Sequence, residues 1–274
     1  MTSQRTRRRR TAPRTPVPIV ALAVIAMVFF ALPLLALVLR VPWSDVGDLF
    51  TASAPREALL LSLFTSIIAT ACALVLGLPL AWVLARTQLP GRHVIRAVCT
   101  LTMVLPPVVA GVALLAALGR RGLIGASLND WFGIRLPFTT PAVVIAQVFV
   151  AMPFLVLTVE SALHSTDRTV EDAARTLGAS PWTVIRRVTL PAVRPAILSG
   201  LVLTWARALG EFGATVTFAG NFPGTTRTLP VATYLALESD VDQALLMSVL
   251  LMIVSFVVLV SMRDRWTGAI GGRR

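Results

Sequence analysis

The most informative segment of this sequence is polar and lies between two long apolar stretches. Residues 171–191 read Glu-Asp-Ala-Ala-Arg-Thr-Leu-Gly-Ala-Ser-Pro-Trp-Thr-Val-Ile-Arg-Arg-Val-Thr-Leu-Pro. The segment begins with acidic and small residues, passes through one glycine, and ends with a basic stretch and a Leu-Pro pair. Cap and turn residues at these positions predict a compact structure outside the apolar part of the fold.

The first part of this segment is predicted to form a short amphipathic helix. Thr169 and Asp172 have the spacing of a capping box, which predicts that Thr169 caps the helix. Glu171 and Asp172 also lie in the first turn, where the helix dipole favours acidic side chains. Apolar residues at helical spacing are predicted to line one face of this helix: Val170, Ala174 and Leu177.

The second part is predicted to turn and start another helix. Gly178 suits the left-handed position that ends a helix. Ser180 and Pro181 then have the order of an N-cap and a first-turn proline. Residues 166–191 are therefore expected to form a compact amphipathic knob, which can dock into a groove on a partner. An interfacial helix or a simple connecting loop is the alternative.

The rest of the chain has the composition of a membrane protein. It is 56% hydrophobic and only 14% charged, and the apolar residues occur in long runs. A helix needs about 20 apolar residues to cross the hydrocarbon core. In lipid, a single segment can satisfy the hydrogen bonds of its backbone only by forming a helix. The predicted fold class is an all-α polytopic membrane protein. Its six predicted transmembrane helices cover residues 17–39, 58–85, 94–118, 139–162, 192–218 and 243–262.

The predicted spans divide the chain into three parts. Residues 1–16 are rich in Arg, Thr and Pro, and are expected to be a disordered basic tail. Residues 17–262 form the membrane domain, which includes the loop 163–191, and residues 263–274 form a second tail. The first span lacks a small-x-small cleavage site, so it is expected to be an uncleaved anchor and not a signal peptide.

Arginine distribution predicts the orientation of the chain. The net charge of +12 would suggest nucleic-acid binding in a soluble protein. Here, with the N-terminus inside, eighteen arginines fall in cytoplasmic segments and six in external ones. This positive-inside bias places both termini and the loop 163–191 in the cytoplasm. The external arginines are Arg40, Arg56, Arg120, Arg121, Arg135 and Arg227.

The basic residues also exclude one kind of chemistry. All 25 are arginine, and lysine is absent. A phosphate loop that ends in Gly-Lys-Ser/Thr needs a lysine, as does Schiff-base catalysis. The sequence therefore predicts no catalytic residues of these types, and an ATP-driven process would need its ATPase on another subunit.

The loop resembles the coupling loop of ATP-binding-cassette (ABC) importer permeases. That pattern is Glu-Ala-Ala, three residues, Gly, nine residues and Ile-x-Leu-Pro, and this chain has Asp for the Glu and Val for the Ile. The resemblance implies a type I importer permease architecture, with a cytoplasmic coupling helix that receives movement from a separate ATPase. ATP and Mg²⁺ would then bind that ATPase and no cofactor would bind this chain. The residues implied in coupling are Glu171, Asp172, Ala173, Ala174, Gly178, Val188, Leu190 and Pro191.

A wider resemblance covers about residues 57–262. Residues 208–215 and 218–221 look like the oxyanion branch of these permeases, and 119–125 and 223–230 look like its molybdate members. The resemblance implies an inner-membrane homodimer that works with two ATPase subunits and an extracytoplasmic oxyanion-binding protein. Molybdate or tungstate is the implied cargo, and sulfate or thiosulfate is the alternative. A channel or an ion-coupled carrier is the alternative of a different class.

Two charges and two prolines suggest a route for the anion. Arg207 and Glu211 are taken as the formal charges inside the predicted spans, and their spacing predicts one shared helix face. Intramembrane charges usually face a cavity or the bundle interior, so Arg207 is predicted to line the pathway and Glu211 to neutralise it. A structural ion pair is the alternative. Pro106 and Pro107 predict a kinked helix that also lines the pathway, and a kink with no role in transport is the alternative.

The remaining candidates are weaker. Arg120, Arg121 and Arg227 lie near the predicted outer face, where they could attract the anion or contact the binding protein. Two cysteines in apolar spans are expected to be inert thiols, and two histidines are expected to lack the Cys or carboxylate neighbours of a metal site. No metal site is predicted. These last four residues are Cys72, Cys99, His93 and His164.

Overall fold

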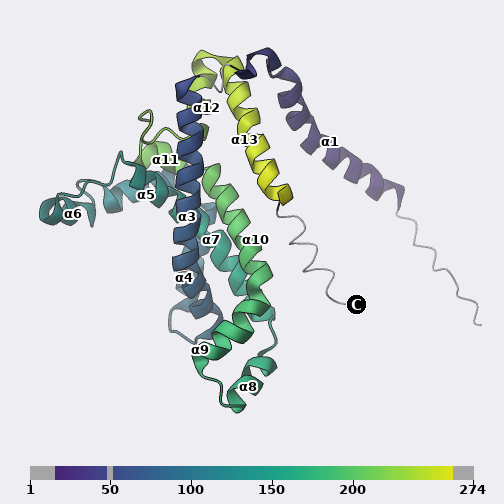
Figure 1. Ribbon diagram of the computed structural model, residues 1–274, viewed down its shortest axis with the longest axis vertical. Coiled ribbons are helices and arrows are strands. Elements are labelled where there is room, and N and C mark those ends of the chain that lie inside the picture. The colour runs from purple at the N-terminus through teal and green to yellow at the C-terminus, as the bar shows by residue number, and fades with distance from the viewer. Residues whose placement is uncertain (1–15, 48–51, 262–274) are drawn as a thin grey trace, which may run out of the picture. The chain divides into compact units, whose positions relative to one another are not determined.

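The structure, a computed structural model, describes residues 16–47 and 52–261 (Figure 1). Within these ranges the regular structure is helical and contains no strand, which confirms the all-α prediction. The helices are α1 (Val17–Arg40), η1 (Trp43–Asp45), α3 (Ser53–Arg86), α4 (Arg92–Val104), α5 (Pro107–Leu118), α6 (Gly125–Phe132), α7 (Thr140–Ser165), α8 (Arg168–Thr176), α9 (Pro181–Val184), η2 (Ile185–Thr189), α10 (Leu190–Leu209), α11 (Gly213–Phe218), α12 (Leu229–Ser239) and α13 (Val241–Ser261). The predicted tails lie outside the described residues, apart from Pro16.

Long apolar helices confirm a multi-pass membrane protein. Five helical stretches of the described residues are long and apolar enough to span a bilayer: Val17–Arg40, Ser53–Arg86, Thr140–Ser165, Pro181–Leu209 and Val241–Val260. The predicted third span, 94–118, is not a continuous helix. It is divided into α4 and α5, and α5 is shorter than a full span.

The division of this span has a local cause. Leu105 precedes a proline and adopts an extended backbone with ψ 131°, because the α conformation is disfavoured before proline. Pro106 has ψ 133°, and Pro107 then starts α5 at the position where a missing N–H costs nothing. The prediction of a kinked helix at Pro106 and Pro107 is therefore wrong, because the helix is interrupted there and not merely bent.

The predicted fifth span, 192–218, is interrupted as well. α10 ends at Leu209, and α11 begins at Gly213 after a short irregular segment. Two of the six predicted spans thus consist of a longer helix, a break and a shorter helix.

α1 belongs to a compact unit that ends at Val41, and a second unit begins at Pro42. None of the residues of α1 is buried, and its exposed side chains include Phe29 and Phe30. A helix that is apolar on all sides suits a lipid environment. This agrees with the first predicted span.

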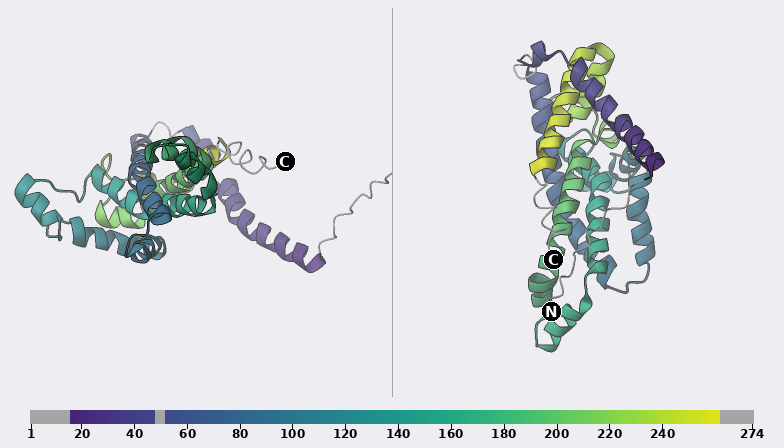
Figure 2. Two further views of the ribbon diagram at one scale, coloured as in Figure 1. Left: turned by 90° about the horizontal axis from the view of Figure 1, so that it is seen from below. Right: turned by 90° about the vertical axis from the view of Figure 1, so that its right-hand side faces the viewer.

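α7 forms the centre of the second unit. α3 and α10 pack along it, as the views in Figures 1 and 2 show. Close packing depends on small residues: a Cβ added at Gly200 of α10 would lie 2.9 Å from Cδ1 of Leu155. Such small positions let transmembrane helices approach closely. The core around the C-terminal half of α7 contains Ala81, Leu84, Leu155, Val159 and Val193.

The two ends of α7 carry different structures. Its last residue, Ser165, leads directly into α8 and α9, which lie at one end of the bundle (Figure 1). At its first residue, the Thr140 hydroxyl donates a hydrogen bond to the Thr225 carbonyl at 2.9 Å, so the 221–228 loop lies at the opposite end. The chain therefore separates the predicted coupling loop from the predicted outer loops by the length of a membrane-spanning helix.

Candidate functional site

The predicted knob is present, although its first cap differs from the prediction. Asp167, and not Thr169, is the N-cap of α8: its Oδ1 accepts a hydrogen bond from the Thr169 backbone N–H at 2.9 Å. This hydrogen bond lowers the pKa of the exposed Asp167 carboxyl below its ordinary value. The capping-box spacing was misleading because an earlier acid competes for the same position.

The turn after α8 follows the prediction. Gly178 has φ +87°, in the left-handed region, and its N–H donates to the Arg175 carbonyl at 2.9 Å. The Ala179 N–H donates to the Ala174 carbonyl at 3.0 Å, which completes the helix end. Ser180 then caps α9 by accepting from the Thr183 N–H at 3.2 Å, with a proline at the first helical position.

The knob exposes several apolar side chains beside its charged ones. Leu177 is 88% exposed, and Val170 is 57% exposed, while Ala174 is half-buried. Trp182, which the sequence reasoning did not single out, is 67% exposed on α9. A tryptophan on a polar loop is a recognisable signal for a contact surface, since exposed Trp residues are enriched where proteins bind one another.

The two acidic residues of α8 have different surroundings. Asp172 is exposed and lies 3.3 Å from Arg175 in an ion pair within the helix. Glu171 is buried, and its Oε1 accepts hydrogen bonds from Arg86 Nη2 at 2.7 Å and from Thr189 Oγ1 at 3.0 Å. The sequence reasoning placed both acids at the positive end of a helix and missed this burial, because the partners are distant in sequence.

The remaining residues predicted for coupling, Val188, Leu190 and Pro191, lie where the knob joins α10. Val188 lies in η2, a π-helical turn of five residues that continues directly into α10. Leu190 and Pro191 are the first residues of α10, which directly continues the helical residues of η2. Single π turns inside helices are uncommon and are frequent at functional sites.

A second cluster lies at the break between α10 and α11. Arg207 is near the end of α10, and Glu211 follows the helix end, so the predicted shared helix face is wrong. The two side chains still meet, with Arg207 Nη1 2.5 Å from Glu211 Oε2. Glu211 Oε1 accepts a hydrogen bond from the Ala214 N–H at 2.8 Å, and its side chain is 1% exposed while that of Arg207 is 28% exposed.

The structure brings the two helix breaks together. A Cβ added at Gly213 would lie 2.6 Å from Cβ of Pro107, so the start of α11 lies directly against the start of α5. A Cβ at Gly111 would similarly lie 2.6 Å from Cβ of Thr217. The two predicted pathway elements, the Pro106-Pro107 pair and the Arg207–Glu211 pair, therefore belong to one site. Nothing in the sequence spacing indicated this contact.

A third charged cluster was missed by the sequence reasoning. Glu160 of α7 is buried, and its Oε1 is bound by Arg96 of α4 and lies 3.6 Å from Nε2 of His164. Arg207 and Glu211 are thus not the sole charges in the predicted spans, and His164 does have a carboxylate neighbour. Among the described residues, no group of three His, Cys, Asp or Glu side chains is placed to hold a metal ion.

The predicted outer arginines lie in connecting segments between helices, outside the helices themselves. Arg120 and Arg121 are exposed in the turn between α5 and α6. Arg227 is half-buried, and its Nε donates to the Asn221 carbonyl at 3.0 Å. They do not form one cluster with Arg207. Cys72 is half-buried and Cys99 is buried, and both are free thiols.

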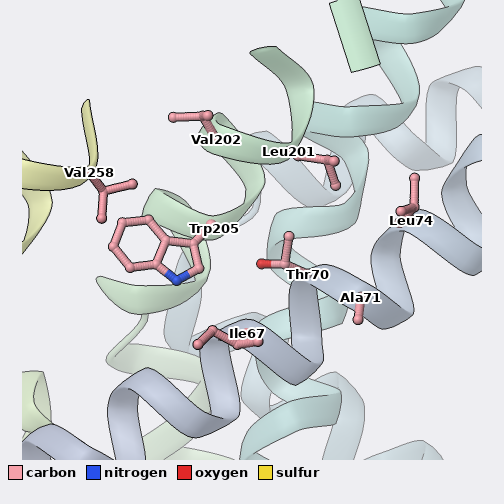
Figure 3. Close-up of a pocket in the computed structure, with 8 residues that line it drawn as sticks. All are labelled: Ile67, Thr70, Ala71, Leu74, Leu201, Val202, Trp205 and Val258. Carbon is pink, nitrogen blue, oxygen red and sulfur yellow. The ribbon is translucent and has the colours of Figure 1, made fainter. Parts of the chain in front are cut away.

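An apolar cavity lies between α3, α10 and α13 (Figure 3). Trp205 faces Val258 across it, and the polar atoms that Figure 3 draws are the Thr70 hydroxyl and the Trp205 indole nitrogen. Its wall lacks charge, so this cavity does not fit an oxyanion. The remaining lining residues are Ile67, Ala71, Leu74, Leu201 and Val202.

Comparison with known proteins defines the family. Residues 77–271 match the family described as "binding-protein-dependent transport system inner membrane component". The chain belongs to this family of ABC importer permeases. It is 47% identical over 237 residues to the molybdenum transport system permease protein ModB of Mycobacterium tuberculosis, covering 86% of this chain and 89% of that protein. It is 43% identical to ModB of Escherichia coli K12, covering 74% and 90% of the two chains.

Other relatives are less similar. The sulfate transport system permease protein CysW of Synechocystis is 39% identical, with 73% of each chain covered. Among solved structures, the alginate ABC transporter with its periplasmic protein matches with a TM-score of 0.74 at 18% identity, covering 90% and 94% of the two chains. The MetNI methionine transporter matches with a TM-score of 0.62, also at 18% identity, covering 78% and 95%. These structural matches support the fold.

Proposed function

We propose that this chain is the transmembrane permease subunit of an ATP-driven importer of molybdate or tungstate. The observation that supports this most is the identity of 47% and 43% to permeases named for molybdenum transport, over nearly their whole lengths. The relative named for sulfate transport is 39% identical over a smaller share of the chain. Sulfate import is therefore the second candidate.

The knob at residues 166–191 is the proposed contact with a separate ATPase. Its exposed apolar side chains, Val170, Leu177 and Trp182, suit a groove on a partner. Gly178 lets the chain reverse between α8 and α9, and it keeps the surface there flat. ATP and Mg²⁺ bind the partner in this proposal, and the present chain supplies no catalytic residue. Cytoplasmic termini and a homodimer with two ATPase subunits complete the assembly.

The meeting point of the two broken helices is the proposed anion route. Irregular backbone at membrane depth is tolerated where it lines a cavity, and transporter sites often use interrupted helices. Arg207 is partly exposed there and can attract an anion. Glu211 holds Arg207 in place and reduces its charge, so the anion passes without being trapped. Arg120, Arg121 and Arg227 are proposed to face the binding protein outside.

The energetics require coupling. A bare charge costs tens of kcal/mol to move into an apolar medium, so a dianion does not leak across. Moving two negative charges inward against about 100 mV costs roughly 4.6 kcal/mol. A thousandfold accumulation adds about 4 kcal/mol. ATP hydrolysis on a partner supplies work of this size, whereas a channel does not.

The substrate is tested by ATP-dependent uptake into proteoliposomes that contain this chain, its ATPase and its binding protein. Labelled molybdate and labelled sulfate are offered separately, and tungstate, sulfate and phosphate are then added as competitors. Uptake of molybdate that tungstate inhibits and sulfate does not is the expected result. Uptake of sulfate alone would keep the architecture and overturn the molybdate assignment.

A further inference from the structure

Glu171 is an unusual residue for an exposed cytoplasmic helix. It is the only buried residue of α8, with 3% of its surface exposed, whereas its neighbour Asp172 is exposed. α8 therefore has almost no apolar attachment to the bundle. Apart from the chain itself, the contact of α8 with the membrane helices depends largely on one carboxylate.

That carboxylate joins three helical elements. Oε1 of Glu171 accepts from Arg86, the last residue of α3, and from Thr189, the residue directly before α10. The side chains of Arg86 and Glu171 are 8% and 4% exposed, so water screens the pair little. Arg168 adds a weaker contact, as its Nη2 donates to the Ala85 carbonyl at 3.4 Å.

Stability alone gives little reason for such a pair. A buried ion pair often adds little net stability over an apolar pair of the same size, because both charges lose hydration. It does hold its partners in one arrangement, since separating them leaves a buried charge uncompensated. The pair therefore fixes α8 to α3 and α10 in a way that an apolar contact would not.

We propose that Glu171 is the positioning residue through which movement of the coupling helix reaches the membrane helices α3 and α10. This inference rests on the proposed function. The docking surface and the transmitting residue lie on different sides of α8: Val170 and Leu177 are exposed towards a partner, while Glu171 is buried towards the bundle. α3 and α10 both pack on α7, and α10 ends at the Arg207–Glu211 break. Displacing the ends of α3 and α10 that lie next to α8 moves α10, which leads to the proposed anion route, and α3, which packs against α10.

The test measures ATP hydrolysed and molybdate transported in the same proteoliposomes, with the complete importer. Glu171→Gln keeps the shape of the side chain and removes its charge, and Arg86→Gln removes the partner. Each variant is expected to retain the ATPase on the purified permease and to continue hydrolysis. Molybdate transported per ATP is expected to fall by at least about tenfold. The double variant is expected to lose no more than either single variant, because both remove one interaction.

Glu160→Gln is the matched control. Glu160 is also a buried glutamate in an ion pair with an arginine, but its partners, Arg96 and His164, lie on α4 and α7. It is expected to lower transport per ATP by less than about twofold, since it leaves the α8 attachment intact. Thr189→Val removes only the hydroxyl and is expected to give an intermediate loss, which tests the link to α10 if the Glu171→Gln permease itself does not fold.

Three results would overturn this inference. In the first, Glu171→Gln and Thr189→Val transport as much molybdate per ATP as the unmodified protein does. In the second, the ATPase dissociates from the Glu171→Gln permease, and in the third, Glu160→Gln loses as much transport per ATP as Glu171→Gln does. The proposed function fails in a different way. If the unmodified complex shows no ATP-driven oxyanion uptake, the function is wrong whatever the variants do.

Discussion

The knob and the break site differ in how they are built. The knob is exposed, and its turn and caps are made by residues within a few positions of one another, such as Gly178 and Ser180. The break site is exposed at Pro106 and Pro107 and buried at Glu211 and Gly213, and Pro107 meets Gly213 from a distant part of the chain. Local signals specify the turn and caps of the surface that is proposed to meet a partner, whereas tertiary packing brings together the residues of the proposed anion route. Variants that damage one region and spare the other test this separation.

The largest effect is expected from Gly178→Asp. Residue 178 has φ +87°, where a side chain costs about 1–2 kcal/mol, and the new carboxylate would enter the proposed ATPase contact. Loss of the ATPase from the purified permease and at least about a tenfold loss of uptake are expected. Pull-down of the ATPase measures the first, and proteoliposome uptake measures the second.

Gly91→Asp provides the matched control for that variant. Gly91 has φ +83° and, like Gly178, has no atom within 4 Å of an added Cβ, but it lies between α3 and α4. The backbone strain is therefore similar and the position differs. Equal loss of ATPase binding in both variants would assign the effect to strain and would contradict the docking role of the knob.

The next largest effect is expected from Arg207→Gln. Removing the positive charge from the proposed route should lower molybdate uptake by about tenfold, while the ATPase remains bound. The variant also leaves Glu211 buried without its partner, which can destabilise the fold. The double variant Arg207→Gln, Glu211→Gln removes that complication. Uptake that stays low in the double variant supports the pathway role, and full recovery would make the pair purely structural.

A smaller effect is expected from replacing the exposed apolar residues of the knob. Leu177→Ser and Trp182→Ser should each weaken ATPase binding, by roughly 1–3 kcal/mol if these residues are central to the contact. Titration of the ATPase onto permease in nanodiscs measures this change. Trp131→Ser is the control, because Trp131 is 78% exposed on α6, away from the knob. A matching loss in the control would indicate a nonspecific effect.

The smallest effect is expected from Asp167→Ala, which removes the N-cap of α8. Amides in the first turn of α8 should exchange hydrogen faster, while uptake at neutral pH changes little. The lowered pKa of Asp167 gives a pH dependence with a definite sign. The cap stabilises α8 above the ordinary carboxyl pKa, and this contribution is lost as the pH falls through the lowered value. If the protection of these amides, relative to their intrinsic exchange rate at each pH, does not fall on acidification of the unmodified protein, the result would contradict this cap.

The sequence predicted what depends on short-range rules. The all-α membrane fold follows from the length of the apolar runs. The turn at Gly178 and the cap at Ser180 follow from the preference of glycine for helix C-terminal ends and of serine for helix N-caps. The number of continuous spans was wrong, because hydropathy alone does not register that Leu105 and Pro106 interrupt a helix. Apolar residues on both sides of a break keep the average high.

The buried ion pairs could not be predicted in this way. Glu171 finds Arg86, and Glu160 finds Arg96, across separations set by helix packing. A glutamate on a polar loop has the same local pattern whether it is exposed or buried. Covariation between the two positions of each pair would be the signal that a single sequence lacks.

The most direct measurement is molybdate uptake into proteoliposomes under four conditions: this chain alone, without the ATPase, without the binding protein, and with both partners, each with and without ATP. We expect uptake only in the complete system with ATP, because the proposed function gives this chain the coupling surface and the route and places the ATPase on another subunit. Uptake by the chain alone, whether passive or driven by an ion gradient, would make it a channel or a carrier and would contradict the account.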